Sequence, residues 1–162
     1  MDISPGGRVF LQDALLRPHE KEIVVWHPVP RVTNPMKMLD KEKTILFAEP
    51  VETTSLELKS LLAERGERPV FAKTLKETLL TLQSEPVDVL VLDAALLEED
   101  CGFISVIRGI EKELPIIVCA ETNTPEMESK IRQQRIFYYH IKSFGTQDLV
   151  MAISNAVNGL AR

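Results

Sequence analysis

Three residues with chemically useful side chains each follow a different apolar segment of this chain. Glu49 and Asp93 stand directly after two such segments, and Lys142 follows a third. A carboxylate beside a lysine can form an ion pair or, with a second acid, bind a divalent cation and take part in phosphoryl transfer. Which chemistry is available depends on the elements that bring Glu49, Asp93 and Lys142 together.

Apolar segments alternate with amphipathic ones, in five repeats of a strand followed by a helix. Strands apolar on both faces are typical of parallel sheets covered by helices. Right-handed crossovers then predict an α/β fold with a doubly wound parallel sheet. The carboxyl ends of such strands share one edge, where ligands bind. The expected strands are residues 43–48, 69–73, 87–92, 115–119 and 136–141.

Helix signals fill the intervals between these strands. Thr53 or Thr54 is expected to cap the first helix, and Thr74 forms a capping box with Glu77. Thr124 before a proline predicts another helix start, for a helix that reaches about Arg135. Helical spacing predicts these inward-facing residues: Val51, Leu58, Leu61 and Leu62, then Leu75, Leu79 and Leu82, then Phe103, Val106, Ile107 and Ile110, and finally Leu149, Val150, Ile153, Val157 and Leu160.

Residues 1–40 differ from the rest of the chain by holding half of its ten prolines. That density excludes a long helix. Their apolar clusters include residues 23–26, which predict one short strand and contain the only tryptophan. We expect an N-terminal extension over residues 1–40 and a main domain over 41–162. The extension is either a docking or dimerisation arm, or it folds back on its own domain.

Charge and composition narrow the classes of partner. The net charge of −5 belongs to residues 41–162, since residues 1–40 hold five basic and five acidic residues. No basic stripe predicts nucleic-acid binding, and no apolar run reaches the roughly 20 residues that span a membrane. Cys101 and Cys119 lack metal-ligand spacing, and Cys119 is expected to be a buried thiol. We expect a cytoplasmic protein with neither nucleic acid nor membrane as a partner.

The sequence also lacks the patterns of common enzymes. His19, His27 and His140 have no serine, cysteine or acid at a triad spacing, and no glycine-rich turn follows the first strand to cradle a dinucleotide. The acidic run at residues 98–100 is expected to be a solvated loop rather than a metal site. We therefore expect a protein that is not an enzyme.

Four segments, taken together in their order and spacing, resemble the receiver domain of response regulators, the CheY-like modules of two-component signal transduction. The resemblance spans about residues 43–159 and implies a flavodoxin-like sheet in the strand order 2-1-3-4-5. It also implies that Asp93 matches the phosphoacceptor, Glu49 the acidic pocket, Lys142 the phosphate-pairing lysine and Tyr139 the switch aromatic. The four segments are residues 45–49, 87–93, 115–118 and 139–144.

Two of the departures from the pattern of that family bear on the binding of metal and of the phosphoryl group. Pro50 stands where receivers have a second acid that contacts Mg²⁺, and Ala120 stands where they have a hydroxyl that donates to the phosphoryl group. Mg²⁺ needs near-octahedral oxygen ligands, and Glu49 and Asp93 alone are weak candidates, with Glu121 as a conceivable substitute. We expect no metal site and no cofactor, and expect Asp93 to form a structural ion pair with the lysine.

Three hypotheses for function follow from this resemblance. The first is an atypical, pseudo-receiver signalling module that is not phosphorylated in the usual Mg²⁺-dependent way and acts through protein–protein interaction. The alternative is a working phosphoacceptor of a phosphorelay that takes a phosphoryl group on Asp93 from a histidine kinase. The third is a small-ligand sensor with a pocket between Pro50 and Ala120.

We expect the domain to transmit any signal by contact with a partner protein. The resemblance implies a histidine kinase or a downstream effector, or a second copy of the chain in a homodimer. The association face implied by the resemblance comprises residues 125–135, 137–142 and 146–159. On it, Arg132, Arg135 and Asp148 are candidates for ion pairs between subunits.

Overall fold

The computed structural model describes residues 41–54, 56–97 and 101–159. In this part of the chain, five parallel strands form one sheet in the order β2-β1-β3-β4-β5, which confirms the predicted fold and strand order. The predicted extension at residues 1–40, the acidic run at 98–100 and Leu160 lie outside the described residues. The strands are β1 (Lys43–Ala48), β2 (Glu67–Ala72), β3 (Val89–Asp93), β4 (Ile116–Ala120) and β5 (Tyr138–Ile141).

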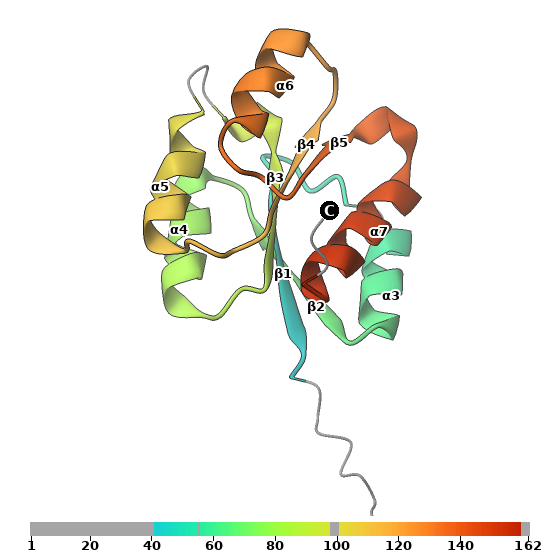
Figure 1. The fold of residues 1–162 in the computed structure, drawn as a ribbon. Helices are drawn as coiled ribbons and strands as arrows, with labels where there is room; N and C mark the ends of the chain where they lie inside the picture. The colour runs from blue at the N-terminus through green and yellow to red at the C-terminus, as the bar shows by residue number, and fades with distance from the viewer. Residues whose placement is uncertain (1–40, 55, 98–100, 160–162) are drawn as a thin grey trace, which may run out of the picture. The chain divides into compact units, whose positions relative to one another are not determined.

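Helices cover both faces of the sheet (Figure 1). One layer holds α3 (Leu56–Glu64) and α7 (Thr146–Val157). The other layer holds α4 (Leu75–Ser84), α5 (Gly102–Ile110) and α6 (Pro125–Arg132). Short 3-10 turns, η1 (Ala94–Leu96) and η2 (Lys142–Phe144), follow β3 and β5. Within the described part of the chain, no helix combines the length and the apolar character needed to cross a membrane.

The sheet separates two apolar clusters, because successive side chains of a strand point to opposite faces. Leu46 and Leu90 belong to the cluster under α4, α5 and α6, whereas Ile45 and Val91 belong to the cluster under α3 and α7. The same alternation assigns Cys119 to the α3–α7 side and its neighbour Ala120 to the other. The face on which a residue lies therefore decides which functional groups it can meet.

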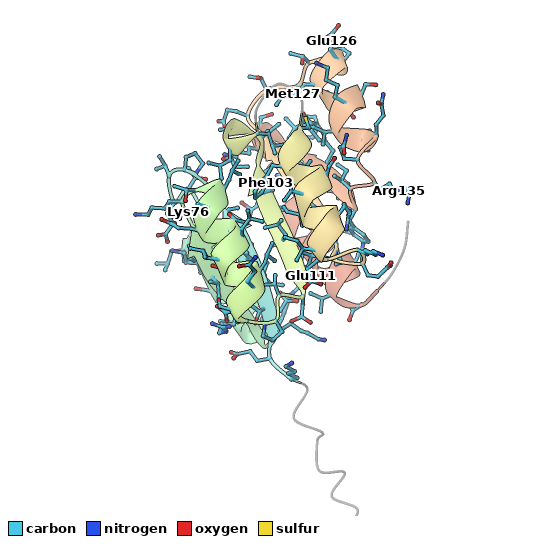
Figure 2. All side chains as sticks on the ribbon, turned by 90° about the vertical axis from the view of Figure 1, so that its left-hand side faces the viewer. Lys76, Phe103, Glu111, Glu126, Met127 and Arg135 are labelled. Carbon is cyan, nitrogen blue, oxygen red and sulfur yellow. The ribbon has the colours of Figure 1, made fainter. Side chains whose placement is uncertain are left out.

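The inward face of α5 differs from the prediction. Ile104 and Ile107 are fully buried, but Val106 and Ile110 are 50% and 45% exposed. The segment holds five apolar residues in nine, so two different stripes satisfy helical spacing, and the sequence does not decide between them. Figure 2 views this layer from outside, with Phe103 near the start of α5 and Glu111 just past its end.

Helix ends follow the predicted signals in two of three cases. The hydroxyl of Thr74 accepts from the backbone N–H of Glu77, and that of Thr124 accepts from Met127. The carboxylate of Glu77 accepts from the N–H of Lys73, one residue before the cap that a capping box would serve. The third case, Thr53 and Thr54, is wrong, because α3 begins at Leu56 and neither threonine stands directly before it.

Two other expected bounds were also wrong. Val51 is 67% exposed and lies in the loop before α3, so it is not part of the inward face of that helix. The α6 helix ends at Arg132 rather than near Arg135, whose φ of 57° is left-handed and incompatible with a continuing helix.

Candidate functional site

Asp93 and Lys142 form an ion pair at the carboxyl edge of the sheet. Asp93 is the last residue of β3 and only 7% exposed. Its Oδ2 accepts from Lys142 Nζ at 2.7 Å, and its Oδ1 accepts from the backbone N–H of Ala95 at 2.8 Å. Both carboxylate oxygens therefore already have hydrogen-bond donors, one from η1 and one from the lysine that opens η2.

Lys142 also forms an ion pair with a second acid. Its Nζ lies 3.4 Å from Oε2 of Glu121, an exposed residue that follows β4. Burial disfavours the charged form of Lys142, but the hydrogen bond and negative charge of Asp93, with the charge of Glu121, outweigh burial and raise the pKa of Lys142. The lysine is therefore a stable cation at neutral pH, bridging Asp93 and Glu121.

Glu49, after β1, is held by the loop that follows it. Thr53 Oγ1 donates to Oε2 at 2.7 Å, and Thr54 Oγ1 donates to Oε1 at 2.8 Å. The N–H of Thr54 donates to Oε1 at 3.4 Å. A carboxylate that is 8% exposed needs such donors, and the two threonines supply them. In the described ranges, Glu49 has no lysine or arginine within ion-pair distance.

These side chains border one cavity of about 250 Å³. The structure brings Glu49, Asp93, Lys142 and Glu121 together, as the topology predicts. Pro50, Ala120 and Tyr139 do not line this cavity, so it is not the pocket expected between Pro50 and Ala120. The lining residues are Phe47, Ala48, Glu49, Thr53, Thr54, Leu58, Val91, Asp93, Cys119, Glu121, His140, Lys142, Gly145, Thr146 and Leu149.

Two of the buried lining residues, Cys119 and His140, were not among the predicted site residues. They are paired in the register of β4 and β5. Burial, aided by the charge of Asp93, raises the pKa of the Cys119 thiol to about 12, so it stays protonated. His140 is 3% exposed, and its Nδ1 has no hydrogen-bond partner in the part of the chain described. The period of two along β5 is the signal that could have placed His140 beside Lys142.

His140 predicts an acid-sensitive stability. Burial lowers its pKa, and the charge of Lys142 lowers it further against the opposing charge of Asp148. Below the ordinary pKa of about 6.5, the unfolded chain takes up a proton that the folded chain resists. We therefore expect unfolding free energy to fall between about pH 6.5 and pH 5, by at most about 1.4 kcal/mol per pH unit from this residue.

The check is urea unfolding of the protein and of His140→Leu at several pH values. The variant should lose this part of the pH dependence, and the contribution of His19 and His27 cancels because both proteins contain them. A His140→Leu protein with an unchanged slope would contradict the assignment.

Tyr139 lies on the opposite side of β5, in the layer of α4, α5 and α6. It is 5% exposed, and its hydroxyl has no partner among the described residues. Burial, with the charge of Glu128, raises its pKa, and the guanidinium of Arg132 lies over its ring at 5.6 Å. Arg132 also pairs with Glu128 at 2.7 Å, in an exposed contact within α6.

The donor set does not fit the Mg²⁺ that the resemblance implies. Over residues 41–54, 56–97 and 101–159, no group of three or more His, Cys, Asp or Glu side chains is placed to hold a metal ion. Glu49 is bound by threonine hydroxyls and Asp93 by a lysine and a backbone N–H. Pro50 supplies no carboxylate. The site is therefore an ion pair beside a hydroxyl-bound acid.

Comparison with solved structures agrees with this fold. A response regulator from Thermotoga maritima has a TM-score of 0.64 at 20% identity, covering 72% of this chain and 98% of that one. A signal receiver domain of an HD domain-containing protein from Pseudomonas fluorescens has 0.63 at 22%, covering 74% and 97%. The response regulator TrrA from Thermotoga maritima, solved with Mg²⁺ and BeF, has 0.57 at 23%, covering 70% and 98%.

The sequence comparisons give no match. No family model matches the chain, and no curated protein matches it. The likeness is therefore one of architecture: five parallel strands in the same order, with helices around them. The chain has the CheY-like fold of response-regulator receiver domains.

Proposed function

We propose that this protein is an atypical receiver-like signalling module that acts through protein contact, without Mg²⁺-dependent phosphorylation of Asp93. The proposal rests on one observation: both acids at the edge of the sheet are hydrogen-bonded by side chains of the protein itself. Asp93 is bound by Lys142, and Glu49 by two threonine hydroxyls.

Phosphoryl transfer to a carboxylate needs a metal to neutralise charge, because the catalysis is mostly positioning and electrostatic stabilisation. Pro50 removes a ligand, and Ala120 removes a donor for the phosphoryl oxygens. In this proposal, Lys142 supplies the positive charge that holds Asp93, and its partner Glu121 steadies the lysine from outside. The domain then keeps one arrangement and presents a fixed surface to a protein partner.

The alternative function is that of a phosphoacceptor that receives its phosphoryl group from a histidine kinase. The position of Asp93 at the end of β3 and the neighbouring Lys142 favour this alternative. Intact-mass spectrometry after incubation with Mg²⁺ and acetyl phosphate separates the two. We expect at least about 100-fold less phosphorylation than in a receiver domain that has the second acid after its first strand and is treated in the same way. Asp93→Asn is the matched control, since it removes the acceptor. Formation of a phosphoryl adduct that Asp93→Asn abolishes would overturn the proposal in favour of the alternative.

A further inference from the structure

The cavity at the carboxyl edge carries more negative than positive charge. Glu49, Asp93 and Glu121 line it, and Lys142 is the basic residue in its wall. Lys142 is already shared between Asp93 at 2.7 Å and Glu121 at 3.4 Å. Glu49 has only hydroxyl and N–H donors in the described part of the chain. A buried carboxylate without a cation is costly, so a cation that reached Glu49 would be stabilised there.

A second feature of the same cavity is independent of its acids. His140 lines the cavity and is only 3% exposed. Its Nδ1 has no hydrogen-bond partner among the described residues. Buried polar atoms are almost always hydrogen-bonded, but this nitrogen itself has almost no accessible surface, so His140 contributes a polar ring to the wall rather than an exposed acceptor. Burial keeps the imidazole neutral, so it does not repel a cation.

The shape of the acceptor set favours an organic cation over a metal ion. In the described residues, no three His, Cys, Asp or Glu side chains converge on one point. Ammonium and guanidinium groups carry several N–H donors that point in different directions, and they match dispersed acceptors. The volume of about 250 Å³ is below the roughly 300–1,000 Å³ of drug-sized ligand pockets. It suits the head group of a side chain.

Apolar side chains on the neighbouring segments indicate the source of that cation. Val51 is 67% exposed in the loop between β1 and α3, Leu56 is 79% exposed at the start of α3, and Phe144 is 72% exposed in η2. The β1–α3 loop carries Thr53 and Thr54, and η2 begins with Lys142, so the same segments line the cavity. Exposed apolar patches bordered by polar residues mark protein-binding sites, and these three side chains stand on segments that also line the polar cavity.

We infer that the cavity binds a lysine or arginine side chain of a partner protein. Glu49 supplies the principal negative charge, and His140 and the threonine hydroxyls complete the polar wall. Val51, Leu56 and Phe144 contact apolar residues beside the inserted cation. This inference rests on the proposed function, because a metal ion and a phosphoryl group would need the same space.

The test is an NMR titration of the full 162-residue chain with two blocked tripeptides, Leu-Arg-Leu and Leu-citrulline-Leu. Citrulline keeps the shape of arginine and removes its charge. We expect the arginine peptide to bind at least about tenfold more tightly than the citrulline peptide, with shifts at the amides of Thr54 and Lys142. Glu49→Gln should reduce its affinity by at least about tenfold.

Two further variants make the result unambiguous. Glu111→Gln, at the far end of α5 in Figure 2, removes an exposed acid and should leave the affinity unchanged. Lys142→Met should raise the affinity by about threefold or more, since it removes a competing cation and frees Asp93. A gain of this kind cannot come from misfolding.

Three results would overturn the inference: equal binding of the two peptides, an unchanged affinity in Glu49→Gln, or no gain in Lys142→Met. Methylguanidinium is the probe for a free small cation. If it bound as tightly as the arginine peptide, the cavity would belong to small cations, and the assignment to a partner side chain would fall. Phosphorylation of Asp93 is measured separately, so a failure of the proposed function is distinguished from a failure to bind the peptide.

Discussion

Lys142→Met is expected to lower the free energy of unfolding at pH 7 by about 2–3 kcal/mol. The change leaves the carboxylate of Asp93 buried without its cation. Fully buried pairs cost about 3–5 kcal/mol when one partner is removed, but 26% of the Lys142 side chain is exposed, so water recovers part of the loss. Urea unfolding followed by circular dichroism measures the effect.

A double-mutant cycle separates the ion pair from general damage. Asp93→Asn keeps a side-chain oxygen for the N–H of Ala95 and removes the charge. The double variant Asp93→Asn/Lys142→Met should therefore be more stable than Lys142→Met alone, with a coupling energy of at least about 1 kcal/mol between the two positions. Additive effects would mean that the 2.7 Å contact contributes little to stability.

The sheet and its edge were predictable because they depend on a simple pattern. Strands apolar on both faces belong to a parallel sheet, and β1 has the predicted bounds of Lys43–Ala48. Once the strands are parallel, the residues that follow them must share one edge. That topology brings Asp93 and Lys142, 49 residues apart in the chain, to the same edge, and the resemblance to receiver domains indicated that they pair.

The wall of the cavity was less predictable, because it depends on loop conformation and on the face of each strand. Thr53 and Thr54 have the residue type of helix caps, and only the burial of Glu49 recruits them as hydrogen-bond donors. Ala120 and Tyr139 were predicted to belong to the same site as Asp93. The pleat places them in the cluster under α4, α5 and α6, and neither lines the cavity.

Helix faces were ambiguous where apolar residues are abundant. In α5, Val106 and Ile110 fit helical spacing as well as Ile104 and Ile107 do, and only packing against the sheet distinguishes them. A polar residue of the same helix, Arg108, is more informative. Its guanidinium reaches the amino edge of the sheet, a role that sequence spacing does not reveal because its partners are backbone carbonyls.

Arg108 joins two connections that are distant in sequence. Its Nη1 donates to the carbonyl oxygens of Lys112, at 3.2 Å, and Leu114, in the segment between α5 and β4. Its Nη2 donates at 2.8 Å to the carbonyl of Arg135, the residue with a left-handed φ between α6 and β5. Burial lowers the pKa of Arg108 from its ordinary value, but the guanidinium remains charged at neutral pH.

Arg108→Met is expected to lower the free energy of unfolding by about 2–3 kcal/mol. Methionine keeps the apolar stem and removes all three bonds to carbonyls. A hydrogen bond to a charged group contributes about 1.5–3 kcal/mol in net terms, but two of these three bonds are exposed, so water can replace much of their contribution. Arg132→Met is the matched control, since Arg132 makes an exposed pair with Glu128 and a contact with the Tyr139 ring, and its loss should cost about 1 kcal/mol or less. Equal losses in urea unfolding of the two variants would contradict a structural role for Arg108. A loss confined to Arg108→Met would show that this one side chain stabilises both the α5–β4 and the α6–β5 connection, at the edge of the sheet opposite to the cavity.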